Sequence, residues 1–343
     1  MKRFFLLTLA SAALLGASAA PVKTYEVKSP DGRLALVLTA GERLSFTVAR
    51  DGETLVAPSE MALTLSTGEV LGESPRVRSA RRRAVTETID APLYRQSRFD
   101  AAYNELDLRL RGDYGILARA YDDGVCYRFY TERDGELTIV DETAQLNFEG
   151  DPSAYIPYSK TEIPMRTSFE NTYEYAPLSK FRTQTVAFMP VLVDLGERGY
   201  VLYTESDVEA YPGVYLTYDK EAKGFAARFA ECPTETSLTK RFQDVVERSA
   251  DYIARVDGRR SYPWRIVAYA ATATELPVND MVWQTAEASR VADASWVRDG
   301  KIAWDWWNNW GVYGVDFKSG INTETCRLST RRLTVFLRQV SKN

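Results

Sequence analysis

Apolar residues alternate with polar or small residues along much of this sequence, and turn-forming dipeptides separate the alternating runs. A period of two places every second side chain on the same face, so each run predicts a half-buried antiparallel strand. Such runs recur from residue 24 to about residue 260, which favours a large β-sandwich over a parallel α/β sheet. Clear examples lie at residues 34–38, 44–48, 106–110 and 125–129, the last directly after Asp123 and Gly124.

Two later segments are less regular. Residues 238–256 fit an amphipathic helix, although their final part fits a strand equally well, and the sequence leaves both open. Farther on, Asn279 and Asp280 are suited to cap a short helix that continues to Ala286.

Tryptophan is concentrated in one short segment. Four of the seven Trp residues of the chain lie within residues 304–310, interleaved with Asp305, Asn308 and Asn309. An indole face can stack on the C–H face of a sugar ring while Asp and Asn bind its hydroxyls. A buried strand with packed tryptophans explains the same composition, so both interpretations stay open at this point.

Composition limits the chemistry available to the chain. The formal net charge is −4 and we find no sustained stripe of Lys and Arg, which argues against a nucleic-acid partner. The sequence contains no His, so carboxylates are the natural acids, bases and metal ligands. A hydrophobic content of 45% with 26% charged residues is typical of a soluble globular protein.

The first 20 residues have the pattern of a secretory signal peptide. Lys2 and Arg3 precede an apolar core at residues 4–15, and small residues at 17–19 form a cleavage site. The core is shorter than a membrane span. We therefore expect export across the inner membrane, a periplasmic location and a mature chain that begins near Ala20.

Several long motifs resemble glycoside hydrolase family 97, a family of α-glucosidases and α-galactosidases. The motifs are ARAYDDGVCYRF at 118–129, ESDVEAYPGVYL at 205–216, YPWRIVAYA at 262–270 and the Trp-rich segment at 301–325. They occur in the order found in the family. The resemblance implies a β-super-sandwich at residues 21–272, then a linker and the first strand of a (β/α)8 barrel at residues 273–325.

Residues 326–343 depart from the resemblance. The sequence CRLSTRRLTVFLRQVSKN is strongly basic and lacks the tyrosines expected of the family. We expect a truncated or frameshifted product that ends after one barrel strand, with a divergent tail as the alternative. One strand cannot close an eight-stranded barrel, so the catalytic acid and base would lie beyond this chain, which alone would be inactive.

The resemblance also implies a substrate and a metal. The complete enzyme would hydrolyse α-glucosidic or α-galactosidic bonds with calcium assistance, and the commoner activity of the family slightly favours α-glucosidic bonds. A non-catalytic carbohydrate-binding β-sandwich is the alternative. In either case the partner is an oligosaccharide or an α-glycoside.

The candidate site residues come from two segments. In the Trp-rich strand, Asp305, Trp306, Trp307 and Asn308 are predicted to contact the sugar. A regular strand would point Trp306 and Trp307 to opposite faces, so only one of the two would face the substrate. The resemblance assigns one calcium-binding carboxylate to Glu170, with Glu174 as second choice, and carboxylate oxygens suit that ion.

Overall fold

The structure, a computed structural model, describes residues 22–91, 94–159, 165, 169, 171–238, 244–298, 300, 312 and 314–340, with the backbone alone for 332–340. The chain divides into two compact units, residues 1–287 and residues 288–343. All the described strands lie in the first unit, and the described residues of the second form one helix, α2 (Thr323–Val340). The domain boundaries expected at 272/273 and 325/326 stay predictions.

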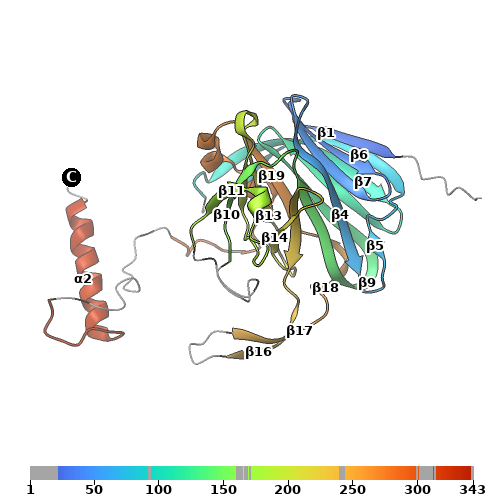
Figure 1. Cartoon of the computed structure of the whole chain (residues 1–343). Coiled ribbons are helices and arrows are strands. Elements are labelled where there is room, and N and C mark those ends of the chain that lie inside the picture. Colours follow the sequence, from blue (N-terminus) through green and yellow to red (C-terminus); the bar gives the residue numbers. More distant parts are fainter. Residues whose placement is uncertain are drawn as a thin grey trace, which may run out of the picture. The chain divides into compact units, whose positions relative to one another are not determined.

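The first unit is mainly β, as predicted, and every strand pairing within its described residues is antiparallel (Figure 1). One layer begins with the alternating runs of the N-terminal part, where Leu34, Leu36 and Leu38 are buried while their neighbours are partly exposed. In spatial order its strands are β1 (Lys23–Lys28), β2 (Leu34–Ala40), β3 (Leu44–Arg50), β4 (Glu53–Leu65), β9 (Gly124–Asn147), β15 (Gly224–Phe229) and β14 (Val214–Asp219), with β5 (Val70–Leu71) on β4.

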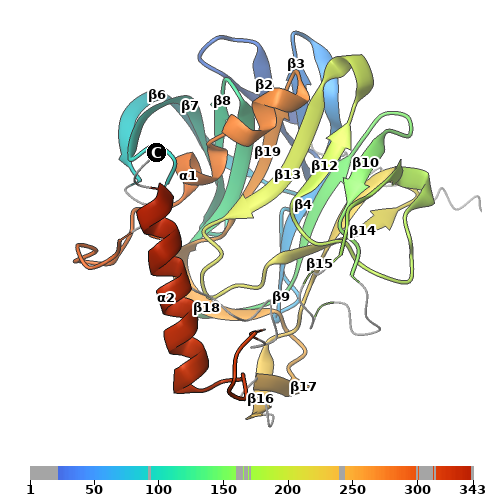
Figure 2. The ribbon, with the colours of Figure 1, turned by 90° about the vertical axis from the view of Figure 1, so that its left-hand side faces the viewer.

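The second layer is wider and also contains β9 (Figure 2). Its strands, in spatial order, are β6 (Val77–Asp90), β7 (Arg98–Leu110), β8 (Tyr114–Tyr121), β9, β19 (Trp264–Ala270), β13 (Tyr200–Ser206), β12 (Val191–Asp194), β10 (Ser153–Ile156) and β11 (Glu174–Pro177). Strand β18 (Ala254–Ser261) pairs with the middle of β9. Short 3-10 helices lie in the loops at η2 (Leu178–Lys180), η3 (Gly196–Arg198) and η4 (Ala273–Val278).

Strand β9 joins the two layers. Its first part pairs with β8 and β19 in the second layer, and its last part pairs with β4 and β15 in the first layer. At 24 residues it is far longer than an ordinary strand of five or six residues. The layers are therefore connected by hydrogen bonds as well as by side-chain packing.

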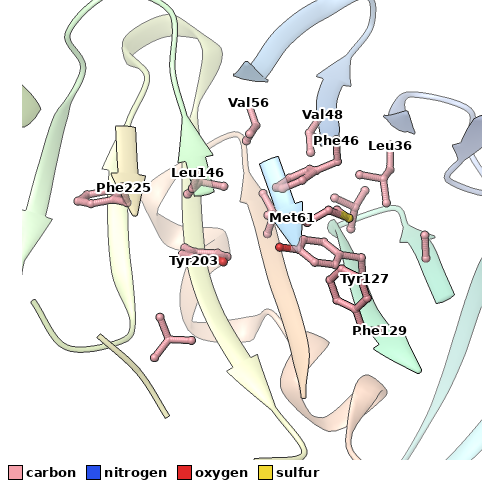
Figure 3. Packing of buried hydrophobic residues seen from close by; sticks show 14 of the residues in the cluster. Leu36, Phe46, Val48, Val56, Met61, Tyr127, Phe129, Leu146, Tyr203 and Phe225 are labelled. Carbon is pink, nitrogen blue, oxygen red and sulfur yellow. The ribbon is translucent and has the colours of Figure 1, made fainter. Parts of the chain in front are cut away.

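The main core lies between the layers. Phe46 of β3 packs against Tyr127 of β9 with ring centroids 4.9 Å apart, and Met61 and Val48 surround the pair (Figure 3). Alternation explains the burial, since Leu36, Phe46 and Val48 all lie on the inner face of their strands and are no more than 1% exposed.

The second layer buries part of its outer face as well. A smaller apolar cluster on that face includes Trp264, Cys126 and Met281, all fully buried, and Met281 comes from helix α1 (Met281–Thr285). The helix starts where predicted but ends one residue earlier, and Asp280 does not cap it. Instead Asn279 Oδ1 accepts from the Met281 amide at 3.1 Å.

The Asp280 carboxylate has other partners. It accepts hydrogen bonds from the Tyr94 hydroxyl and from Arg95 Nη2, each at 2.7 Å. These contacts fasten the start of α1 to the loop between β6 and β7. The Asp280 side chain thus makes tertiary hydrogen bonds in place of the predicted capping bond at the start of α1.

The helical interpretation of residues 238–256 is wrong. The chain forms a hairpin of β16 (Pro233–Leu238) and β17 (Asp244–Ser249), followed by β18. The hairpin extends away from the sheet (Figure 1), and Leu238 and Val245 are exposed on it. An amphipathic helix needs an apolar surface to pack against, and this arm lies beyond the core.

Helix α2 has a local start signal. The Thr325 amide donates to Asn322 Oδ1 at 2.9 Å, and the Gly320 amide donates to Thr325 Oγ1 at 3.1 Å. The helix continues through most of the basic tail that departs from the family resemblance. Within the part of the chain that the structure describes, none of the helices combines the length and the apolar character needed to cross a bilayer.

Candidate functional site

The residues predicted to contact sugar and calcium are Asp305, Trp306, Trp307, Asn308 and Glu170. All five lie outside the described residues. Their roles stay predictions, and the description below concerns the side chains that flank Glu170 and the residues that position them.

An aromatic cluster includes Phe169, the residue before Glu170 in the sequence. Its other members are Tyr173 and Phe188, from loops that precede β11 and β12, and Tyr215 of β14. Phe169 lies 5.6 Å from Tyr173 and 5.5 Å from Phe188 between ring centroids, and Phe188 lies 5.3 Å from Tyr215. Tyr173 is 44% exposed. The chain on either side of Glu170 is thus fixed by ring packing and leaves one large aromatic face toward solvent.

Glu174, the second choice for a calcium ligand, already has a cationic partner. Its carboxylate pairs with the Arg182 guanidinium, which also lies 5.0 Å from the ring centroid of Tyr158. Calcium takes six to eight oxygen ligands. Among the described ranges no three carboxylates or thiolates lie close enough together to hold a metal ion, so these residues alone do not form a calcium site.

In the interior of the first unit, a buried cation connects several strands. Arg265 of β19 is 1% exposed and donates to both oxygens of Glu142 at 2.8 and 2.7 Å. Its other terminal nitrogen donates to Glu205 Oε2 at 2.6 Å. Glu205 Oε1 accepts from the Val214 amide at 3.0 Å, which fixes the loop that leads into β14.

Burial and ion pairing shift the pKa values of Arg265 and Glu205 in opposite directions. Burial alone would lower the pKa of Arg265, but the Glu142 carboxylate beside it holds that pKa well above its usual range. For Glu205 burial is the larger effect and raises the pKa of the carboxyl, while Arg265 opposes the shift. The cluster is therefore a structural ion network held by complementary charges.

Sequence reasoning missed this network, although a signal was present. The run YPWRIVAYA has a single charged residue, Arg265, amid apolar residues that alternate within a strand. A charge inside such a run needs a buried partner of opposite sign. The partners, Glu142 and Glu205, are 123 and 60 residues away, so spacing could not identify them.

The hairpin motif ARAYDDGVCYRF also has a structural role. The predicted turn between β8 and β9 is formed by Asp122 and Asp123, Gly124 is the first residue of β9, and Cys126 is buried. A Cβ atom on Gly124 would lie 2.0 Å from Met281 Sδ and 2.8 Å from the Ala268 Cα atom. Only glycine fits there, because α1 packs directly on the turn.

The same motif supplies two arginines to the outer face of the second layer. The Arg119 and Arg128 guanidinium carbons lie 4.8 and 4.4 Å from the ring centroid of Trp264. Arg119 also pairs with Glu105 at 2.8 Å, and Arg128 pairs with Asp207 at 3.4 Å. The motifs that carry the family resemblance therefore position strands and loops in the described part of the chain.

Two curated relatives match most of this chain. The retaining α-galactosidase of Bacteroides thetaiotaomicron is 37% identical over 311 residues, which cover 88% of this chain and 47% of that protein. A probable retaining α-galactosidase of Streptomyces bingchenggensis is 29% identical over 286 residues, covering 81% and 39%. The chain thus spans less than half the length of either relative.

Solved structures share the fold. A glycoside hydrolase family 97 enzyme in complex with acarbose, from Pseudoalteromonas sp. strain K8, superposes with a TM-score of 0.73 at 17% identity, covering 90% of this chain and 45% of that one. A β-arabinopyranosidase gives a TM-score of 0.59 at 18% identity, covering 72% and 40%. Residues 27–287 match the family described as Glycosyl-hydrolase 97 N-terminal. The chain therefore belongs to glycoside hydrolase family 97, and residues 27–287 correspond to the N-terminal domain of that family.

Proposed function

We propose that this chain is the N-terminal part of an exported retaining α-galactosidase. The observation that carries the proposal is the 37% identity over 311 residues with the retaining α-galactosidase of Bacteroides thetaiotaomicron. The Streptomyces relative has the same name, qualified as probable. Both favour α-galactosides over the α-glucosides that the sequence alone slightly favoured.

Retention of configuration requires two carboxyl groups about 5–5.5 Å apart, one as nucleophile and one as acid and base. We assign neither role to a described residue. The proposal places both groups in the part of the enzyme that matches the remaining half of the relatives. Residues 301–325 would begin the barrel that carries them, with Asp305, Trp306, Trp307 and Asn308 at the sugar.

Calcium is part of the proposal for the complete enzyme, with Glu170 as one ligand. A bound calcium ion would supply a fixed positive charge near the substrate. Glu170 is supported by its place in the chain, directly after Phe169 and three residues before the exposed ring of Tyr173. The paired state of Glu174 makes that carboxylate the poorer ligand.

The test uses the genomic DNA downstream of codon 326. We expect a reading frame for further barrel strands, and a read-through product that hydrolyses p-nitrophenyl α-galactoside faster than the α-glucoside. Proton NMR should show the α-anomer of galactose as the first product. Faster hydrolysis of the glucoside, or a β-anomer, would overturn the assignment.

The 343-residue chain is assayed beside it. Turnover by this chain at an enzyme-like rate would show that the acid and base lie within it. If the read-through product binds sugar without hydrolysing it, the non-catalytic carbohydrate-binding alternative replaces the enzyme.

A further inference from the structure

Exposed aromatic side chains are concentrated at one edge of the second layer. Among the described residues of 22–287, four aromatic side chains are exposed: Tyr155, Tyr173, Tyr175 and Trp283. The three tyrosines lie in β10, in β11 or directly before β11. Tyr173 belongs to the cluster beside Glu170, whereas Tyr155 and Tyr175 form a separate pair.

The pair is built by strand register. Tyr155 and Tyr175 lie directly opposite each other across β10 and β11, with ring centroids 4.6 Å apart. Ala154 and Ile156 on either side of Tyr155 are fully buried, so Tyr155 points to the outer face of the layer. Figure 1 shows β10 and β11 together, and β11 pairs with no other described strand.

A carboxylate completes the surface. The Tyr175 hydroxyl donates to Asp194 Oδ2 at 2.9 Å, and Asp194 lies in β12, opposite Ser153 of β10. The Asp194 Oδ1 atom accepts from the Gly196 amide at 2.9 Å, which fixes the carboxylate in place. Two rings and one oriented carboxylate thus meet on three neighbouring strands.

The exposure of the rings leaves apolar surface available to a ligand. Tyr155 is 39% and Tyr175 52% exposed, so both rings keep much of their apolar surface in water. An edge strand is normally protected by charges, proline or a covering segment, not by two exposed aromatics. A galactose ring has an apolar face formed by neighbouring C–H groups, which stacks on tyrosine, and hydroxyls that a carboxylate can accept from.

We propose that Tyr155, Tyr175 and Asp194 form a sugar-binding surface for α-galactosyl saccharides. The choice of galactose rests on the proposed function, while the choice of a sugar rests on the two rings and the carboxylate. The surface would hold a saccharide chain on the N-terminal domain.

Saturation-transfer NMR on the 343-residue chain with methyl α-galactoside tests the proposal. We expect transfer to the sugar protons, reduced at least about fivefold in Tyr155→Ala and in Tyr175→Ala. Tyr175→Phe keeps the ring and loses the bond to Asp194, so it should retain at least half of the signal. Trp283→Ala removes an exposed ring elsewhere and should leave the signal unchanged. Circular dichroism confirms that each variant is folded.

Other outcomes overturn either the surface or the choice of galactose. Absence of transfer in the parent chain, or equal transfer in the alanine variants, overturns it. A dimer in sedimentation velocity that Tyr175→Ala dissociates would assign the pair to a second copy of the chain. If the 343-residue chain shows no transfer but the read-through product has α-galactosidase activity, the surface is overturned and the proposed function is retained. Transfer from methyl α-glucoside alone would keep the surface and contradict the galactoside assignment.

Discussion

Arg265 and Glu142 form a two-pronged ion pair in the interior of the sandwich, with N–O distances of 2.8 and 2.7 Å and side chains only 1% and 4% exposed. The pair connects β19 to β9, the strand that both layers share. Glu205 extends it to β13. Three strands of the domain thus depend on one guanidinium.

Arg265→Met should destabilise the domain by about 3–5 kcal/mol, because it leaves Glu142 and Glu205 buried without a cation. Urea unfolding at pH 7, followed by circular dichroism, measures the change. Arg259→Met is the matched control, since Arg259 pairs with Asp134 on the surface where the side chains are 66% and 90% exposed. Its unfolding midpoint should stay that of the parent. Equal midpoints for the two variants would refute a central role for Arg265.

The Asp123 carboxyl should make stability depend on pH. Burial raises the pKa of Asp123 from 3.8 to about 6, and the Asp280 carboxylate adds to the shift. The folded state therefore binds a proton that the unfolded state has released between these pH values, so stability falls as pH rises through that window. The loss over the whole window should be about 3 kcal/mol, since one pKa unit corresponds to about 1.4 kcal/mol.

Asp123→Asn removes this titration and keeps an oxygen for Asn279 to donate to. Urea unfolding at pH 4 and at pH 7 should show a smaller fall in the variant than in the parent chain. Asp122→Asn changes the exposed neighbouring carboxylate and should show the same fall in stability between pH 4 and pH 7 as the parent chain. An unchanged pH dependence in Asp123→Asn would show that other groups cause it.

Gly124→Ala should destabilise the first unit by about 1–3 kcal/mol through overpacking. The new methyl would meet Met281 Sδ at 2.0 Å and the backbone of Ala268 at 2.8 Å. Adding Met281→Ala should restore only part of the stability, because the Ala268 backbone cannot move aside. Gly41→Ala is the control, since its methyl would meet nothing closer than 3.6 Å. Thermal unfolding midpoints of the parent chain, Gly124→Ala, the double variant with Met281→Ala and Gly41→Ala test this prediction. A parental midpoint for Gly124→Ala would contradict the close packing.

Calcium should distinguish Glu170 from Glu174 in the read-through product. Glu170→Gln should abolish most of the rise in thermal midpoint that calcium produces, because a ligand is lost. Glu174→Gln breaks only the surface pair with Arg182 and should keep that rise. The 343-residue chain should show little rise, since a single carboxylate binds calcium weakly. If Glu174→Gln abolishes the rise and Glu170→Gln keeps it, the calcium ligand is Glu174 instead.

Export is tested by N-terminal sequencing of protein produced in a Gram-negative host. We expect the periplasmic fraction to contain a chain that starts near Ala20, because Lys2, Arg3 and the apolar core at 4–15 have the pattern of a signal sequence. Ser18→Arg should slow cleavage by disturbing the small-residue site. A cytoplasmic product that keeps Met1 would contradict the prediction.

The sequence predicted those parts of the fold that follow from local pattern. Strands β2 and β3 lie where Leu36 and Phe46 belong to alternating runs, and the turn directly before Gly124 separates β8 from β9. In such strands the same residues that favour extended backbone also form the buried face, so local and global preferences agree.

Features set by distant contacts were not predictable. The pattern at residues 238–256 fitted a helix, but no core surface lies there, and a hairpin formed. Asp280 was expected to cap α1, yet it bonds Tyr94 and Arg95, nearly 190 residues earlier in the chain. The partners of Arg265 are equally remote. For Glu170 and the Trp-rich strand the family resemblance remains the source of the assignment.

The shared strand β9 determines how the domain unfolds. A single continuous strand supplies hydrogen-bonded neighbours to both sheets of the sandwich, so neither sheet is complete without it. Residues 22–287 should therefore melt in one cooperative step, and a nick in the middle of β9 should undo both halves at once. Insertions in the loops of such a domain leave this shared strand intact, whereas replacement of one sheet alone would remove a strand that the other sheet needs.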